Sequence, residues 1–215
     1  MVHVTAPRKR LFHDEHFRWG RRRMQHEYFV LMRARSQHHP LLAWNQSGSA
    51  FRKARPVAVS EPVKLRLGEP VPAKPIMADF HSLPAPVVSS RLKEVLEAAD
   101  LRGVQFIPAD VEVGDAVHRY WLVHMWREIR CVDREHSDFE DSETGLFMLL
   151  LDRLVLDEAV LREIPLEERL AFALEEHVVY LFHRTVVERV LAMTPPPEGL
   201  RFIPVAEWGA SSAFR

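Results

Sequence analysis

The stretch at 86–111, PVVSSRLKEVLEAADLRGVQFIPADV, constrains the fold most tightly, because a helix start, a helix stop and a strand follow one another without a break. Ser89 and Ser90 are candidate N-caps, and apolar residues then recur at helical spacing. Gly103 lies where a residue in the left-handed conformation would close the helix. The run from Val104 to Pro108 is typical of a strand, and we expect the proline to end it because proline removes a ladder donor.

A looser copy of this plan lies near the C-terminus, in HRTVVERVLAMTPPPEGLRFIPVAEW at 183–208. Its apolar positions Val187, Val190 and Leu191 precede Gly199, and both copies end on the order Gly, apolar, polar, Phe, Ile, Pro. We therefore predict two related helix–strand units. The alternative is a chance likeness, since glycine after a helix and proline after a strand are ordinary punctuation.

The remaining elements are predicted from local composition. A first strand is expected at 28–32, where β-forming residues are dense. The proline-rich region 37–86 is expected to be loop-like with short extended pieces, among them a brief edge strand at 64–68. The aromatic and branched run at 118–132 predicts one long strand or a pair, and apolar residues on both faces favour a central position in the sheet. An extended apolar segment is expected at 146–155.

The segment 166–193 is ambiguous. Helix propensity and apolar spacing favour one long helix, whereas the repeat predicts a break near His177 and a second helix from about His183. Taken together, the elements predict an α+β fold: a mixed or antiparallel sheet with two similar helix–strand units packed on it. The expected organisation is a basic, flexible leader at 1–26, a single domain at 27–208 and a tail at 209–215.

Composition narrows the class of protein. With 215 residues and 47% hydrophobic content, the chain has enough apolar side chains for a sizeable core. Its single cysteine, Cys131, allows no internal disulfide and favours a reducing compartment. The longest strongly apolar run, LFMLLL at 146–151, is too short to span a bilayer, so a membrane partner is not expected and the cytoplasm is the expected location.

Charge is distributed unevenly along the chain. Residues 1–60 hold 12 Lys and Arg against 3 Asp and Glu, whereas residues 61–215 hold 17 against 27. A basic arm of this kind is typical of nucleic-acid binding, but the acidic body would repel phosphate, so a solvated leader is the favoured interpretation. A native start at Met24 is compatible with the same pattern.

No catalytic or metal-binding motif is recognisable. The 12 histidines show no HExxH or HxH spacing, and nucleotide-binding glycine motifs are missing. Cys131 precedes Asp133 and His136, a sequence that would suit a nucleophile–base pair, but a lone buried cysteine beside a strand is the commoner case. We therefore predict no catalytic residue, no metal site and no cofactor.

The stretch at 133–145, DREHSDFEDSETG, is the most distinctive polar feature, and we expect it to be an acidic, turn-rich loop. One interpretation is a negative patch for a basic partner, and another is a pair of carboxylates for acid–base work, which would need an enclosed site. A solvated surface loop is the plain alternative. The candidate binding residues are Asp133, Glu135, Asp138, Glu140, Asp141 and Glu143.

Six short motifs in order resemble a bacterial family of immunity proteins of polymorphic toxin systems, first described as a domain of unknown function and abundant in myxobacteria. They are VVSSRLKEVL at 87–96, GVQFIP at 103–108, RYWLV at 119–123, CVDREHS at 131–137, LVLDE at 154–158 and EGLRFIPV at 198–205. The resemblance covers about 27–208. The chain departs from the family in its Arg/His-rich leader, in SSRL where an acidic residue is common, and in the PPP insertion before the last strand.

The resemblance implies an α+β fold and a protein that binds and blocks a cognate toxin. Nucleases are one class of toxin with a basic substrate cleft, to which an acidic inhibitor would be steered by charge. The acidic residues of 133–145 are then candidate toxin contacts. Two alternatives from other classes remain: a hydrolase or transferase that uses histidine and carboxylates, and a nucleic-acid binder acting through the basic leader.

Overall fold

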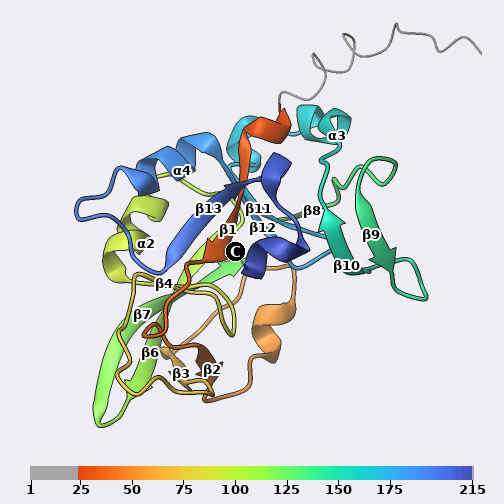
Figure 1. The fold of residues 1–215 in the computed structure, drawn as a ribbon. Helices are drawn as coiled ribbons and strands as arrows, with labels where there is room; N and C mark the ends of the chain where they lie inside the picture. The colour runs from red at the N-terminus through yellow and green to blue at the C-terminus, as the bar shows by residue number, and fades with distance from the viewer. Residues whose placement is uncertain (1–23, 215) are drawn as a thin grey trace, which may run out of the picture.

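A five-stranded sheet forms one half of the computed structural model, which describes residues 24–214 (Figure 1). Its strand order is β13-β1-β12-β11-β8, and β1 pairs antiparallel with both β12 and β13. The short strand β8 runs parallel to β11. The strands are β1 (Tyr28–Arg33), β8 (Glu128–Ile129), β11 (Ala171–Leu174), β12 (Tyr180–His183) and β13 (Leu200–Pro204).

A six-stranded sheet forms the other half, in the order β2-β3-β6-β7-β5-β4. Its longest part is the antiparallel β6–β7 hairpin, and β3 runs parallel to β6. The run at 118–132 is thus a pair of strands, because the chain leaves β7 at Met125 and enters β8 in the other sheet. The strands are β2 (Leu42–Trp44), β3 (Val63–Leu67), β4 (Phe80–His81), β5 (Val87–Val88), β6 (Val104–Val113) and β7 (Ala116–Met125).

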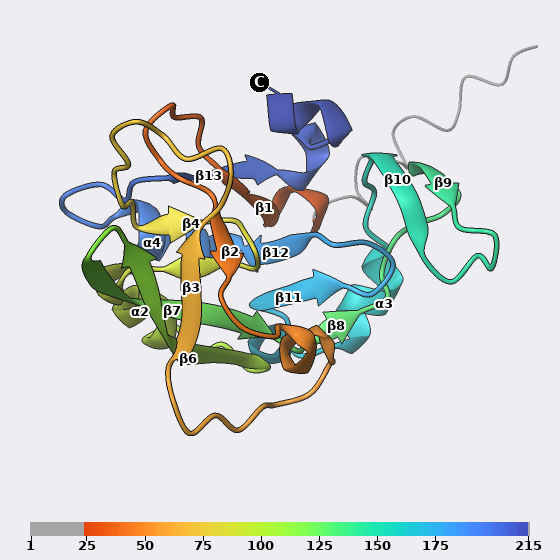
Figure 2. The same ribbon diagram turned by 90° about the horizontal axis from the view of Figure 1, so that it is seen from below.

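A separate two-stranded hairpin stands apart from both sheets (Figures 1 and 2). It consists of β9 (Asp138–Asp141) and β10 (Met148–Arg153). The segment expected to be a loop at 133–145 therefore contains a strand. The acidic residues alternate with Phe139, which packs on the core and gives β9 an inner face.

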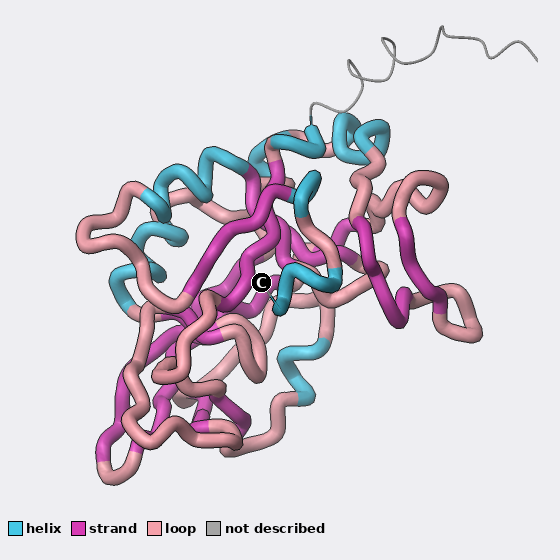
Figure 3. The backbone as a smooth tube through the Cα atoms, viewed as in Figure 1, coloured by secondary structure: helices cyan, strands magenta, loops and turns pink. Residues whose placement is uncertain are grey.

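The helices are short and lie outside the sheets. Figure 3 shows α2 and α4 side by side; α2 packs on β7, and α4 packs on β1 and β12. The α-helices are α2 (Ser90–Glu97), α3 (Glu158–Glu163) and α4 (Arg184–Leu191). The 3-10 helices are η1 (Met24–His26), η2 (Ser49–Arg52), η3 (Leu166–Glu168), η4 (Val205–Glu207) and η5 (Ala210–Phe214). The α+β prediction is confirmed.

The predicted repeat is present and is larger than the sequence indicated. Each unit is a strand, a helix and a strand: β5–α2–β6 and β12–α4–β13. In the first unit the two strands flank β7, and in the second they flank β1. Each helix therefore links two strands that lie on either side of one antiparallel strand.

In both units a side chain caps the start of the helix, and a glycine precedes the second strand. Ser89 caps α2 by accepting a hydrogen bond from Leu92 N, and the His183 side chain caps α4 by accepting one from Thr185 N. Gly103 has a φ of +81° and Gly199 a φ of +84°, each directly before the second strand of its unit. Gly103 does not close α2 as expected, because the helix already ends at Glu97.

Two further predictions need correction. Pro108 does not end its strand: β6 continues to Val113, and the ladder to β3 begins only at Ala109, one residue after the proline. The brief edge strand expected at 64–68 is β3, and it is not at an edge, because it lies between β2 and β6. The short extended pieces expected in 37–86 also include β2 and β4. β3 pairs with the long strand β6, about 45 residues further along the chain, and no local pattern specifies that pairing.

The segment 166–193 follows the repeat rather than helix propensity. It forms η3, then β11 and β12 joined by a turn that contains His177, and α4 starts directly after His183. Ala171, Phe172 and Leu181 are buried in the five-stranded sheet. Sheet pairing thus overrides an amphipathic helical pattern, as tertiary context commonly does.

The two units share a core and a polar link. Leu92 and Leu96 of α2 meet Val187 and Val190 of α4 in one apolar cluster. Beside this cluster, the buried carboxylate of Asp79 accepts four hydrogen bonds: from Ser89 Oγ (2.6 Å), Arg91 Nε and Nη2 (both 2.7 Å) and Glu198 N (2.8 Å). Burial raises the pKa of Asp79, but these donors outweigh burial and hold the pKa below its usual range.

Candidate functional site

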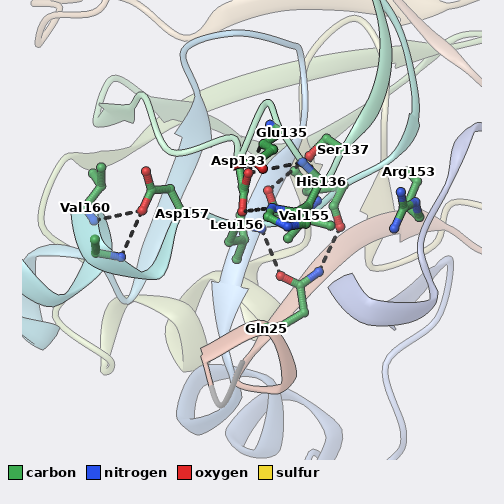
Figure 4. Close-up of polar contacts among 12 residues, drawn as sticks. Gln25, Asp133, Glu135, His136, Ser137, Arg153, Val155, Leu156, Asp157 and Val160 are labelled. Atoms are coloured by element: carbon green, nitrogen blue, oxygen red, sulfur yellow. Dashed lines mark hydrogen bonds and ion pairs between the residues drawn. The ribbon is translucent and has the colours of Figure 1, made fainter. Parts of the chain in front are cut away.

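The turn before β9 uses one of the candidate carboxylates to fix its own backbone. Asp133 Oδ1 accepts hydrogen bonds from Glu135 N (3.1 Å) and His136 N (3.2 Å), and Oδ2 contacts His136 Nδ1 (2.8 Å), as Figure 4 shows. Aspartate side chains commonly close turns in this way. Asp133 therefore builds the turn rather than offering its charge outward.

Two more of the candidate carboxylates brace the hairpin. Asp138 accepts from Arg153 Nε (2.7 Å) and Nη2 (3.2 Å), and this hydrogen-bonded arginine holds the pKa of Asp138 below its usual range. Asp141 pairs with Arg134 Nη2 at 2.5 Å, and the Arg134 guanidinium lies over the Phe139 ring. These exposed pairs hold the shape of the hairpin and contribute little to overall stability.

The other three candidate carboxylates are free for a partner. Glu135, Glu140 and Glu143 are exposed, and no ion pair is found for them within residues 24–214. Glu140 lies opposite Leu150 in the hairpin register, and Glu143 lies in the β9–β10 turn. The structure thus divides the six acidic residues into three that shape the hairpin and three that face solvent.

Apolar side chains are exposed beside these glutamates, which the sequence interpretation missed. Leu146 and Val178 are each 70% exposed, and Leu149 is 64% exposed. The register shifts between Met148 and Leu150, so Leu149 lies at an irregularity of the ladder. We call the set the hairpin surface: Glu140, Glu143, Leu146, Phe147, Leu149 and Val178.

The hairpin is fixed at its base, so the hairpin surface has a defined position. Met148 N donates to Glu176 O (2.8 Å), His177 Nδ1 contacts Met148 O (3.0 Å), and Phe147 packs on the His177 ring. These contacts join β10 to the β11–β12 turn, and Val178 follows in that same turn. Met148 and Leu151 of β10 point into the core, which explains why their neighbours face outward.

The start of η1 supports the segment that follows the hairpin. Gln25 Nε2 donates to Leu154 O (2.8 Å), and Gln25 Oε1 accepts from Leu156 N (2.9 Å), as Figure 4 shows. Met24 N donates to Glu158 at 3.0 Å. Met24 and Gln25 are buried, although the predicted leader extends to residue 26. The rest of that leader, 1–23, lies outside the described residues, and the division of the chain at residue 26 stays a prediction.

The residues that would support catalysis are held in structural contacts. Cys131 is buried, and burial, followed by the charges of Glu176 and Asp157, raises the pKa of its thiol. His136 is bound to Asp133, and Ser137 Oγ donates to Val155 O (3.2 Å) and accepts from Val155 N (2.9 Å). The thiol of Cys131 is therefore protonated and shielded from solvent, which does not favour the nucleophile–base alternative.

A second cluster of titratable groups lies where β1 meets α4. Tyr28 is fully buried, burial raises its pKa to about 12, and its hydroxyl oxygen accepts a hydrogen bond from Arg169 Nη1 (2.5 Å). His183 packs edge-on against Tyr28 while capping α4. Burial lowers the pKa of His183, so the imidazole is held neutral in its capping role. These groups secure the second unit.

Neither a metal site nor a membrane-crossing helix is present in residues 24–214. No group of three or more His, Cys, Asp or Glu side chains there has an arrangement that would hold a metal ion. Within the same residues, no helix combines the length and apolar character that a bilayer crossing requires. The hairpin surface, with exposed apolar side chains beside exposed carboxylates, remains the most distinctive feature of the described residues.

Comparison with known proteins identifies one family. The model of the immunity protein family Imm11 matches residues 13–207, which is most of the chain. A search of curated proteins finds no match. The resemblance in the six sequence motifs is therefore confirmed at the level of the family.

Proposed function

Because the chain belongs to the immunity protein family Imm11, it is an immunity protein, and we propose that it neutralises its toxin by direct contact through the hairpin surface. The family membership favours this function over the hydrolase and nucleic-acid alternatives. A toxin partner follows from the family; the place of contact and the mode of inhibition are our proposal. The toxin is blocked by being covered, with no chemical step by the immunity protein.

The observation that carries the proposal is an apolar strip edged with unpaired carboxylates. Leu146, Phe147, Leu149 and Val178 are exposed although they lie beside a well-packed core. Covering one such side chain in an interface contributes roughly 1.5–3 kcal/mol. Interfaces commonly combine an apolar centre with a polar rim, and Glu140 and Glu143 supply that rim.

The exposed carboxylates favour a partner with a basic surface. Glu135, Glu140 and Glu143 are exposed without an ion pair in the described part of the chain. A toxin with a basic surface, such as a nuclease, would be steered to them and would associate faster at low salt. Asp133, Asp138 and Asp141, the other sequence candidates, contribute by shaping the hairpin.

A protection assay tests this proposal. The full chain is co-expressed with the toxin-like product of the neighbouring gene, and cell survival is measured for the wild type and Leu149→Asp. We expect the wild type to protect and Leu149→Asp to lose protection, because a carboxylate would be buried without a partner.

Val117→Asp is the matched control, since Val117 is also strongly exposed (63%) but lies at the tip of the β6–β7 hairpin. It should protect as well as the wild type. Full protection by Leu149→Asp would place the contact elsewhere. No protection by the wild type would remove the proposed function for that toxin.

A further inference from the structure

A cleft of about 420 Å³ lies beside the end of β1, outside the hairpin surface except for one shared residue. Residues from three places line it: Arg33 and Arg35 at the end of β1, Phe80 and Pro86 around β4 and β5, and Val178 and Tyr180 at the start of β12. Its volume falls in the range of ordinary ligand sites. Val178 makes this cleft continuous with the hairpin surface.

The cleft opens where β1 and β12 separate. Their last antiparallel pair is Val30↔Leu181, whereas β1 continues to pair with β13 as far as Arg33↔Leu200. Beyond Val30, one edge of β1 therefore has no neighbouring strand among residues 24–214. A free sheet edge with unpaired main-chain groups is a template for an added strand.

The direction of the backbone groups supports this view. Ala34 N donates to Gly199 O (2.8 Å) on the β13 side. Because backbone groups of successive residues in an antiparallel strand point to opposite edges, the N–H and C=O of Arg33 point toward the cleft. Within residues 24–214, no backbone hydrogen bond to either group of Arg33 is found on that edge.

The side chains define what the cleft would accept. None of its described lining residues is acidic, and both of its charged side chains are arginines. The Arg33 guanidinium is held against the His39 carbonyl, whereas Arg35 is exposed and has no ion-pair partner in the described part of the chain. Leu31, Phe80 and Val178 add apolar wall. Acidic groups interleaved with apolar ones match this lining.

We propose that the cleft binds an extended, acidic and apolar segment of the toxin, which adds as a short strand to the free edge of β1. The segment pairs with the main chain of Arg33, places a carboxylate on Arg35 and packs an apolar side chain on Val178. This inference rests on the proposed function, and it gives the toxin two features: a basic face for the hairpin surface and an acidic strand for the cleft. Main-chain pairing supplies affinity and the arginine supplies selectivity.

The first test uses short peptides and no toxin. The isotope-labelled full chain is titrated with acetyl-Val-Asp-Val-Glu-amide, with a lysine version of it, and with a version N-methylated on alternate residues. We expect only the first to shift the backbone signals of Arg33, Arg35 and Tyr180, and Arg35→Glu to weaken that binding about tenfold. Equal binding of the lysine peptide, or of the N-methylated one, or no shift with the acidic peptide, would overturn the inference.

The second test uses the toxin and separates the two proposals. Affinity is measured for Arg35→Glu and for the matched control Arg52→Glu, which makes the same charge change in η2, outside the cleft lining. We expect the first to weaken toxin binding about tenfold and the second to leave it unchanged. An unchanged affinity for Arg35→Glu refutes the cleft inference alone, whereas loss of protection through Leu149→Asp still supports the hairpin surface.

Discussion

The carboxylate that links the two strand–helix–strand units, Asp79, is only 8% exposed and is surrounded by four donors, whereas Glu140 and Glu143 of the hairpin surface are exposed and unpaired within residues 24–214. The same chemical group thus stabilises the fold in one region and is available to a partner in the other. Substitutions in the units should change stability. Substitutions on the hairpin surface should change binding.

Asp79→Ala should give the largest loss of stability. It leaves Ser89 Oγ and Glu198 N without their acceptor, whereas Arg91 keeps Pro195 O and Pro196 O as acceptors. The expected loss is about 3 kcal/mol in the free energy of unfolding, because buried donors lose a charged acceptor. Urea unfolding measures it. Glu140→Ala is the control and should unfold at the wild-type urea concentration. An equal loss in the two variants would erase the proposed contrast between the regions.

Gly199→Ala should give the next largest loss of stability, because the backbone conformation disfavours a side chain there and neighbouring atoms leave no room for one. Its φ is +84°, and an added Cβ would lie 2.6 Å from the Phe80 carbonyl oxygen of the other sheet. We expect a loss of about 2–3 kcal/mol from the strained backbone and the close contact.

Gly114→Ala separates these two causes. Gly114 has a φ of +59°, but an added Cβ there meets nothing within 4 Å. The expected loss in the free energy of unfolding is therefore only about 1 kcal/mol, from the backbone conformation alone. Thermal unfolding of both variants checks the difference. Equal losses would mean that close packing between the sheets at Gly199 adds nothing.

The repeat shows which parts of the fold can be predicted from sequence. Ser89, Gly103 and Gly199 are local signals, since a cap or a left-handed residue depends on its immediate neighbours. The break before α4 was predicted by comparing the two copies, where propensity alone favoured a long helix. The pairing of β5 and β12 within their sheets depends on distant partners, and no local pattern specifies it.

The candidate site was only partly predictable for a related reason. Composition pointed to the acidic stretch, but ion pairs such as Asp138–Arg153 depend on the hairpin register. The exposure of Leu149 depends on a shift in that register, and Val178 joins the surface only because the β11–β12 turn packs on β10. The only sequence signal for this surface is the apolar run at 146–151 next to the acidic turn. That run is equally typical of a buried strand, so it does not indicate exposure.

A smaller effect distinguishes the two helix caps by pH. Burial lowers the pKa of His183, so the folded state holds this imidazole neutral while the unfolded state takes up a proton near its ordinary pKa of about 6.5. Glu27 opposes this shift, and Arg169 and Arg184 favour it. Stability contributed by a neutral His183 is present above about pH 6.5 and is lost as the pH falls below that value.

Melting temperatures measured between pH 8 and pH 5 test this difference. His183→Asn keeps a capping side chain that does not titrate, so its melting temperature should fall less than that of the wild type. Part of the decrease should remain, because burial also lowers the pKa of His81. Ser89→Ala should lower the melting temperature by a similar amount at each pH. An unchanged pH profile in His183→Asn would show that the cap does not titrate in this range.

The smallest expected effect on stability, and the sharpest test of the comparison, comes from Glu140→Lys combined with Glu143→Lys. Neither carboxylate has an ion pair in the described part of the chain, so the melting temperature should stay at the wild-type value. The association rate with the toxin at low salt should fall about tenfold, because reversed charges no longer steer a basic surface. At high salt the two rates should converge, since mobile ions screen exposed charges. A rate difference that persists at high salt would indicate a contact-specific effect, and a loss of stability would mean that these glutamates belong, like Asp79, to the framework of the fold.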